Sequence, residues 1–158
     1  MNPLPITNLL SPCTLAELAS MVQAAFVRKT AIYPLGGETS LNFGVPVKTP
    51  GIGISLAKLN RVVDFPHRDL TITVEAGITM RDLYDTLARE RLQLPVDVPQ
   101  AEQATLGGVL ATNWNGPRRF GFGPVRDAVI GISAVDGQGM AFHGGGRVVK
   151  NVAGYDFC

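Results

Sequence analysis

The sequence predicts an α+β fold made of two subdomains, residues 1–66 and 67–158, with a ligand bound between them. Helical and strand-like patterns follow one another irregularly, without the regular strand–helix alternation of a parallel sheet. A hairpin pattern in the second half predicts antiparallel strands. Two glycine-rich stretches, residues 34–46 and 104–113, interrupt these patterns and have the composition of ligand-binding loops.

Length and composition indicate a chain with a core of its own and exclude several kinds of partner. The chain has 158 residues, of which 46% are hydrophobic, and a formal net charge of +1, so nothing favours nucleic acid or an anionic membrane surface as a partner. No apolar run reaches the ~20 residues of a transmembrane helix, and the N-terminus lacks a signal-peptide pattern. The two cysteines have neither metal-ligand spacing nor a disulfide framework. We expect a cytoplasmic protein with no metal site.

The first predicted elements are a helix and a strand. Thr14 and Glu17 have capping-box spacing, in which the threonine hydroxyl caps the helix and the glutamate reaches back. Apolar residues then recur at helical spacing, which predicts a helix over residues 15–28 packed on a sheet. The apolar run at residues 31–35 predicts a strand that leads into the first glycine-rich stretch.

Three further strands are predicted over residues 51–56, 59–65 and 70–76. The first superficially resembles a dinucleotide fingerprint, but Leu56 stands in place of the third glycine and no helix follows, so we reject a Rossmann site. In the third, apolar side chains alternate with polar ones, which predicts one buried face and one polar face. The buried face would consist of Leu70, Ile72, Val74 and Ala76.

A second helix and a hairpin complete the predicted elements. Thr79 caps the helix with Asp82 at the capping-box position, and the apolar stripe consists of Met80, Leu83, Tyr84 and Leu87. Residues 129–135 and 140–143 predict a hairpin around the turn at residues 136–139. The last residues, 154–158, end inside an apolar pattern, as a truncated domain would.

The first glycine-rich stretch has the features of an anion-binding loop. Gly36 and Gly37 have no Cβ, so the backbone can adopt positive φ and approach a ligand closely. Successive N–H groups from Gly36 to Ser40 could then converge into a concave nest, and Thr39 and Ser40 add hydroxyl donors. The same glycine pair is also compatible with a plain tight turn between strands.

The second stretch favours the ligand-binding interpretation. Thr105 precedes Gly107 and Gly108 and a short helix-like run. The N-terminus of such a helix offers free N–H groups and a positive dipole end to an anion. Two loops of this kind in one small chain suit a diphosphate.

Five stretches in this order resemble the FAD-binding domain of the vanillyl-alcohol oxidase / p-cresol methylhydroxylase (PCMH) family. The stretches are Pro34–Leu41, Val74–Gly77, Ala104–Gly108, Arg119–Gly121 and Lys150–Asp156. The likeness covers nearly the whole chain and is greatest to the FAD-binding subunit of glycolate oxidase and related D-2-hydroxy-acid dehydrogenases. It implies FAD between two α+β subdomains, with the pyrophosphate on residues 36–40.

The resemblance implies a set of cofactor-binding residues and leaves the catalytic residues unknown. The cofactor set is Pro34, Leu35, Gly36, Gly37, Glu38, Thr39, Ser40, Leu41, Pro99, Thr105, Gly107, Gly108, Ala111, Thr112, Asn113, Phe120 and Gly121. In the family reaction, a hydride passes from a 2-hydroxy acid such as glycolate or D-lactate to the flavin, and the electrons leave to a partner. The substrate groups come largely from a cap domain, and other oxidase subunits are expected partners.

The sequence departs from the family pattern in three ways. Glu38 places a negative side chain beside the expected diphosphate, so it must point away or pair with a cation. The glycine loop holds no histidine, so we expect non-covalent FAD. The family domain continues beyond the Gly-Tyr-Asp segment, and a cap domain follows. For residues 1–158 alone we therefore expect weak or no FAD retention, no measurable oxidation of 2-hydroxy acids and self-association into homo-oligomers through the apolar C-terminal end.

Several side chains near the glycine-rich stretches have two interpretations each. Arg118 and Arg119 could counter phosphate or substrate charge, or be solvated loop residues. Asp97 could line the site, although an Asx turn is the simpler account. Trp114 is expected to pack near the site. Tyr155 and Asp156, from the last matching stretch, could contact the flavin or make structural hydrogen bonds.

No conventional catalytic group is predicted. His67 and His143 lie apart in the sequence, and we expect surface or turn roles for both. This absence fits a flavin domain, because the cofactor supplies the redox chemistry. Two other hypotheses remain open from sequence: a scaffold that has kept the fold without FAD, and a flavoprotein of the related cell-wall type that reduces a UDP-sugar with NADPH.

Overall fold

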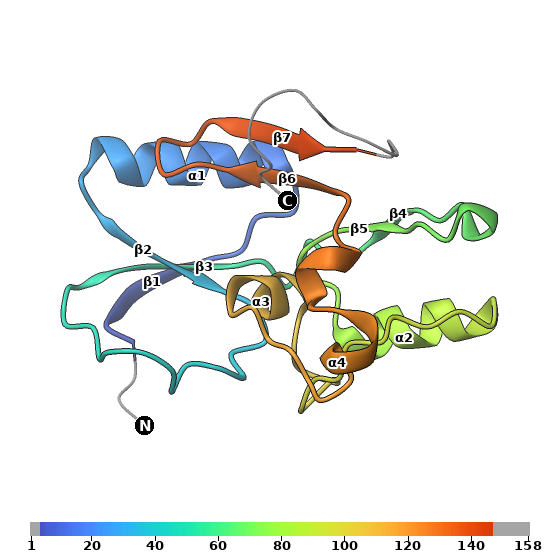
Figure 1. The fold of residues 1–158 in the computed structure, drawn as a ribbon. Coiled ribbons are helices and arrows are strands. Elements are labelled where there is room, and N and C mark those ends of the chain that lie inside the picture. Colours follow the sequence, from blue (N-terminus) through green and yellow to red (C-terminus); the bar gives the residue numbers. More distant parts are fainter. Residues whose placement is uncertain (1–3, 147–158) are drawn as a thin grey trace.

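The computed structural model describes residues 4–146. Within this range the chain forms one three-stranded sheet, two separate two-stranded sheets and several short helices (Figure 1). The predicted roles of Tyr155 and Asp156, and the last matching stretch that contains them, lie outside the described residues.

The three-stranded sheet is parallel, with strand order β1-β3-β2. It consists of β1 (Ile6–Leu10), β2 (Ala31–Leu35) and β3 (Gly51–Ser55), and β3 lies between the other two. The second and third strands confirm the prediction, whereas β1 was not anticipated. Gly53 fits the crowded centre of the sheet, because a Cβ there would lie 3.0 Å from Leu9 Cδ1 and 3.2 Å from Leu35 Cδ1.

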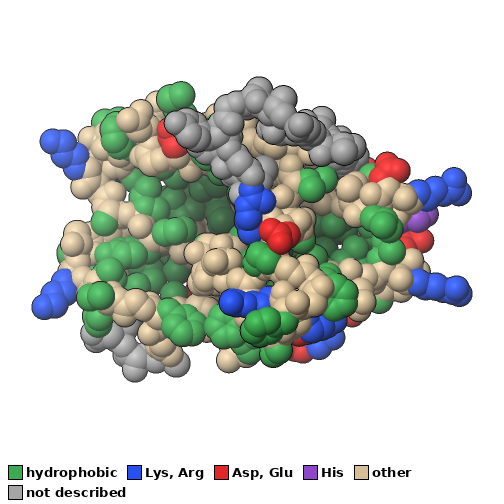
Figure 2. Space-filling view, in the orientation of Figure 1, with side chains coloured by type: hydrophobic (Ala, Val, Ile, Leu, Met, Phe, Trp, Pro, Cys, Tyr) green, Lys and Arg blue, Asp and Glu red, His purple; other side chains and the backbone are tan. Residues whose placement is uncertain are grey.

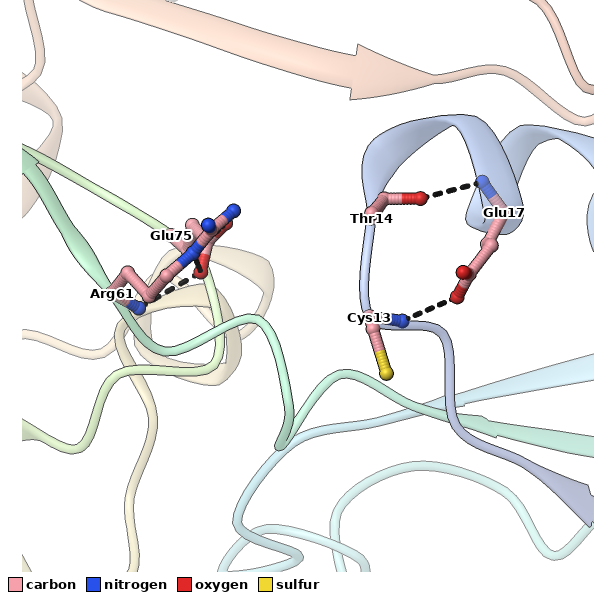
Figure 3. A network of polar contacts seen from close by, with 5 residues as sticks. All are labelled: Cys13, Thr14, Glu17, Arg61 and Glu75. Carbon is pink, nitrogen blue, oxygen red and sulfur yellow. Dashed lines mark hydrogen bonds and ion pairs between the residues drawn. The ribbon is translucent and has the colours of Figure 1, made fainter.

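Helix α1 (Leu15–Val27) connects β1 to β2 and begins as predicted. The Oγ1 atom of Thr14 accepts a hydrogen bond from the N–H of Glu17 at 3.1 Å. The Glu17 carboxylate reaches back one residue further than a capping box requires and accepts from the N–H of Cys13 at 2.7 Å (Figure 3). Two N–H groups at the start of the helix are thereby satisfied.

The next two predicted strands are much shorter than expected. Strands β4 (Val62–Asp64) and β5 (Thr73–Val74) form an antiparallel pair, with the 3₁₀ helix η1 (His67–Asp69) between them. Leu70 caps η1 with a left-handed backbone, φ 56°, and its side chain is 74% exposed, so its predicted burial is wrong.

The rest of the predicted apolar face of this pair divides in two. Ile72 and Val74 pack against the main core, whereas Ala76 is exposed. Arg61 and Glu75 fasten the pair by hydrogen bonds of 2.7–3.2 Å between their side chains, and the N–H of Arg61 donates to the same carboxylate at 2.8 Å (Figure 3). The Arg61 guanidinium lowers the pKa of Glu75.

Helix α2 (Met80–Arg89) anchors the main hydrophobic core and matches its prediction. The Thr79 hydroxyl accepts from the N–H of Asp82 at 3.1 Å and donates to its carboxylate at 2.7 Å. The predicted apolar stripe is buried apart from Tyr84, which is half-buried. The buried residues of this core are Ile78, Met80, Leu83, Leu87, Val96, Ala104, Val109 and Val125.

The second glycine-rich stretch and the chain after it form three short helices and a hairpin. These are α3 (Leu106–Ala111), α4 (Arg119–Phe122), the 3₁₀ helix η2 (Val125–Ala128), and strands β6 (Gly131–Val135) and β7 (Ala141–Gly145). The antiparallel hairpin confirms the prediction. Asp136 Oδ1 shapes its turn by accepting from the N–H groups of Gln138 and Met140.

The hairpin lies against α1 (Figure 1). Gly139, at φ 86°, permits this contact, because a Cβ there would lie 2.7 Å from the carbonyl oxygen of Ala19. The proposed boundary at residue 66 falls between the paired strands β4 and β5. The division into two subdomains remains a prediction.

Within residues 4–146, no helix is both long and apolar enough to cross a membrane. The same residues contain no group of three or more His, Cys, Asp or Glu side chains placed to hold a metal ion.

Candidate functional site

The two glycine-rich stretches meet at an open pocket with a volume of about 250 Å³. Its walls come from the loop after β2, from α3 and from the loop that precedes α3. The lining residues are Pro34, Leu35, Gly36, Gly37, Glu38, Thr39, Ser40, Leu41, Phe43, Val98, Pro99, Gln100, Ala104, Thr105, Gly108, Val109, Ala111, Thr112 and Trp114. Figure 2 shows one face of the molecule, on which apolar side chains line hollowed regions of the surface.

Gly36 and Gly37 are required by the contact between the two stretches. A Cβ on Gly36 would lie 2.3 Å from Thr105 Oγ1, and a Cβ on Gly37 would lie 1.7 Å from the carbonyl oxygen of Gln103. Neither glycine has positive φ; within the stretch positive φ falls on Glu38, at 58°, and on Gly44, at 90°. The two glycines therefore approach other parts of the protein closely, namely the Thr105 side chain and the Gln103 backbone, and positive φ falls on other residues.

The backbone N–H groups from Gly36 to Leu41 provide a row of hydrogen-bond donors at the pocket. Within the described residues none of them donates to a protein acceptor, although all of these residues line the pocket. By contrast, the carbonyl of Leu35, just before them, accepts from the N–H of Leu56 at 2.9 Å. A row of unused donors is compatible with an anion bound through the backbone.

The start of α3 does not supply the free donors that the sequence predicted. The N–H of Leu106 donates to the carbonyl of Ile78 at 2.9 Å, and the N–H of Gly107 donates to the carbonyl of Ala76 at 2.7 Å. The N–H of Gly108 donates to Thr105 Oγ1 at 3.3 Å. The prediction of free N–H donors at this helix start is therefore wrong, because packing on residues 76–79 uses two of those groups.

Four residues of the predicted cofactor set do not line the pocket. Gly107 packs on Ala76, where a Cβ would lie 2.9 Å from the carbonyl oxygen. Asn113 accepts hydrogen bonds from the Asn115 side chain through its carbonyl and side-chain oxygens. Phe120 is 93% exposed on α4, and the space around Gly121 is open. The remaining predicted residues lie at the pocket, and their contact with a cofactor stays a prediction.

Asp97 and Arg118, whose roles the sequence left open, form an ion pair with each other. Arg118 donates to both carboxylate oxygens of Asp97, through Nε at 2.9 Å and Nη2 at 2.5 Å. The guanidinium lowers the pKa of the Asp97 carboxyl. Neither side chain lines the pocket. Arg119 instead lies over the Phe120 ring, with its Cζ 5.7 Å from the ring centroid.

The histidines take surface positions. His67 Nε2 lies 3.9 Å from a Glu90 carboxylate oxygen, and His143 Nδ1 lies 3.0 Å from Ser133 Oγ in the hairpin. Both are exposed, and neither lines the pocket.

Five lining residues were given no role from the sequence: Phe43, Val98, Gln100, Ala104 and Val109. Phe43 and Trp114 both line the pocket, and their ring centroids lie 6.1 Å apart in a tilted arrangement. The prediction that Trp114 packs near the site is confirmed. Phe43 belongs to the first glycine-rich stretch, and Val98 and Gln100 flank Pro99. Their closeness in the sequence to predicted site residues could therefore have identified them.

The pocket combines neutral hydrogen-bond donors with an apolar wall. Over the described part of the chain its lining contains no Lys, Arg, His or Cys, and its one charged residue is Glu38, whose side chain is exposed and has no ion-pair partner there. Such a site can hold a phosphate through N–H groups and a flat ring system through apolar contacts, but it offers no nucleophile activated by a neighbouring base. Redox chemistry at this site would come from a bound cofactor.

Comparison with known proteins identifies that cofactor. Residues 7–145 match the model of the FAD binding domain family. The chain is 33% identical over 156 residues to D-2-hydroxyglutarate dehydrogenase of Xanthomonas citri pv. viticola, covering 99% of this chain and 32% of that protein. It is also 33% identical over 140 residues to glycolate oxidase subunit GlcE of Escherichia coli, covering 88% of this chain and 39% of that protein.

The solved structure of an alkyldihydroxyacetonephosphate synthase superposes with a TM-score of 0.74 at 26% identity, covering 91% of this chain and 29% of that one. The chain spans about a third of the length of the curated relatives it matches. These matches confirm the predicted α+β fold of PCMH type. This chain belongs to the FAD-binding domain family, and its cofactor is FAD.

Proposed function

We propose that the chain is the FAD-binding part of a flavin-dependent oxidoreductase that oxidises a 2-hydroxy acid such as glycolate, D-lactate or D-2-hydroxyglutarate. The names of the relatives support this substrate class: one is a D-2-hydroxyglutarate dehydrogenase and another a glycolate oxidase subunit. They favour it over the reduction of a UDP-sugar. The family match favours FAD binding over a scaffold without cofactor.

One observation supports the proposal that FAD binds in this pocket. The N–H groups from Gly36 to Leu41 lack protein acceptors within the described residues, and all of these residues line the pocket. A pyrophosphate needs several donors in a small space, and backbone N–H groups provide them without bulky side chains. The hydroxyls of Thr39 and Ser40 would add to this set.

The remaining walls would hold the less polar parts of the cofactor. Val98, Pro99 and Ala111 present apolar surface, and the Phe43–Trp114 pair borders the same space. Exclusion of water by such surfaces strengthens hydrogen bonds to the phosphates. Bound FAD supplies hydride acceptance from the carbon that carries the substrate hydroxyl, followed by electron transfer to an acceptor.

Non-covalent binding, the location and the partners are parts of the same proposal. The pocket lining contains no histidine or cysteine among the described residues, which supports FAD that can be released. A subunit of glycolate oxidase among the relatives supports assembly with other oxidase subunits. The unremarkable cysteine content is compatible with the cytoplasm.

A titration with FAD tests the proposal directly. We expect saturable quenching of flavin fluorescence, and acid precipitation of the complex should leave the flavin in the supernatant. Dye reduction by a full-length version of the oxidoreductase tests the substrate class, with glycolate, D-lactate and D-2-hydroxyglutarate as substrates and L-lactate as the control, because residues 1–158 alone are not expected to oxidise these acids. The absence of any FAD binding at high cofactor concentration would refute the proposed site, and equal turnover of all four acids would refute the substrate class.

A further inference from the structure

The loop at residues 95–100 forms one wall of the pocket, and its contacts converge on Asp97. Val98, Pro99 and Gln100 line the pocket directly. The Asp97 carboxylate accepts from Arg118 through both oxygens, and its backbone carbonyl accepts from Trp114 Nε1 at 3.1 Å. One residue of the loop is thus held through its side chain and through its backbone.

Neighbouring contacts hold the same loop from two other sides. The Tyr84 hydroxyl, on α2, donates to the carbonyl of Val96, whose side chain is buried in the main core. Gly116 lies directly against Asp97: a Cβ on the glycine would be 2.7 Å from the Asp97 Cβ and 2.9 Å from its carbonyl oxygen. The loop therefore rests between α2 and the segment at residues 114–118.

We propose that Arg118 and Asp97 are positioning residues that fix the Val98–Gln100 wall and Trp114 in the geometry that binds FAD, without touching the cofactor. The inference rests on the pocket being the FAD site. Arg118 is not among the residues that line the pocket, and its charge is matched by the Asp97 carboxylate. Its contribution is to order the loop before FAD arrives, so that less ordering accompanies binding.

A surface ion pair with no functional effect is the competing explanation, because isolated exposed pairs usually contribute little. The geometry distinguishes this pair from that case. The fork of the Arg118 guanidinium meets the carboxylate in a bidentate arrangement, and the same aspartate also receives the indole N–H of a pocket residue. Arg61 and Glu75 form a matched bidentate pair whose members do not line the pocket, and they serve as the control.

The first test uses the protein without FAD. Trp114 is the only tryptophan, so its emission reports this loop alone. Arg118→Ala and Asp97→Asn should shift that emission to longer wavelength and increase its quenching by acrylamide. Arg61→Ala should leave both properties unchanged. Gly116→Ala, which pushes on the loop from its other side, should change them in the same direction as Arg118→Ala.

The second test measures FAD affinity by titration. Arg118→Ala and Asp97→Asn should each weaken binding about fivefold, because added loop ordering then opposes binding. The double variant should bind no worse than either single variant, since both remove the same interaction. Arg118→Lys, which keeps the charge but loses the fork, should recover part of the affinity. Arg61→Ala should change the dissociation constant by less than about twofold.

The outcomes separate this inference from the proposed function. Wild-type protein that fails to bind FAD would overturn the proposed function and the affinity claim together, whereas the tryptophan measurements would still report on the loop. If wild-type protein binds FAD, an unchanged dissociation constant in Arg118→Ala would overturn the positioning role. The positioning role would be overturned even if the tryptophan emission shifts, because the ion pair would then order the loop without affecting FAD affinity.

Discussion

Gly37→Ala should force apart the two stretches that form the pocket. An added Cβ would lie 1.7 Å from the carbonyl oxygen of Gln103, 2.5 Å from its carbonyl carbon and 3.1 Å from the Cα of Ala104. All three atoms belong to the backbone, so no side-chain rotation relieves the overlap. An ordinary carbon–oxygen contact is about 3.3 Å, so the two backbones would have to separate by roughly 1.5 Å.

This displacement should lower both stability and FAD affinity. Overpacking of this kind lowers the free energy of unfolding by about 1–3 kcal/mol. A shift of ~1.5 Å also takes N–H···O contacts out of the hydrogen-bonding range. Loss of one hydrogen bond to a charged oxygen is worth about 1.5–3 kcal/mol, so the dissociation constant for FAD should rise at least about tenfold.

Flavin-fluorescence titration and thermal unfolding, each with and without FAD, measure the two effects. Gly137→Ala is the matched control, because it makes the same chemical change in the hairpin turn, where a Cβ would meet nothing within 4 Å and φ is not positive. We expect the control to retain wild-type affinity and melting temperature. Wild-type affinity and stability in Gly37→Ala would refute the contact between the two stretches as the basis of the site.

Three further variants test the helix cap at Thr105, the charge of Glu38 and the pH dependence of the stabilisation by the Arg61–Glu75 ion pair. Thr105→Val removes the acceptor of the Gly108 N–H in a 5% exposed side chain, and should lower the free energy of unfolding by about 1 kcal/mol in a denaturant titration. Glu38→Gln should tighten FAD binding about twofold at low salt and have no effect at high salt, since Glu38 is the one charged residue of the described lining; weaker binding in calorimetry would show that the carboxylate helps instead. Arg61 lowers the pKa of Glu75 below its usual 4.5, so the ion pair stabilises the fold above that pH, and this stabilisation is lost as the pH falls through the lowered value. Acid titration of stability should show Glu75→Gln less stable than wild type at pH 7, with the difference vanishing at the acid end; parallel curves would contradict this.

Local features of the fold follow directly from the sequence. The caps at Thr14 and Thr79 and the hairpin turn at Asp136 were predictable, because each involves partners at most four residues apart. Their geometry depends on helix pitch and turn type, which a short window of sequence contains. The location of the pocket was also predictable in outline, since two glycine-rich stretches accounted for most of its lining.

Contacts between distant segments decided the features that the sequence missed. Leu70 alternates as a buried strand residue would, yet a left-handed turn exposes it. Strand β1 gains its place by pairing with β3, whose first residue lies about forty positions further along the chain. Arg118 pairs with the carboxylate of Asp97 across a separation of 21 residues.

Glycine-rich segments could be located from the amino-acid sequence alone, whereas the packing of distant segments sets which of their N–H groups stay available at the pocket. The donors at the start of α3 pair with carbonyls of Ala76 and Ile78, whereas within the described chain those from Gly36 to Leu41 have no protein acceptor. A sequence window shows that a segment has donors, but it cannot show whether a carbonyl about thirty residues away lies within 3 Å of them. Buried N–H groups pair with acceptors that the packing provides, and the loop after β2 keeps N–H groups that FAD would accept from in the site we propose.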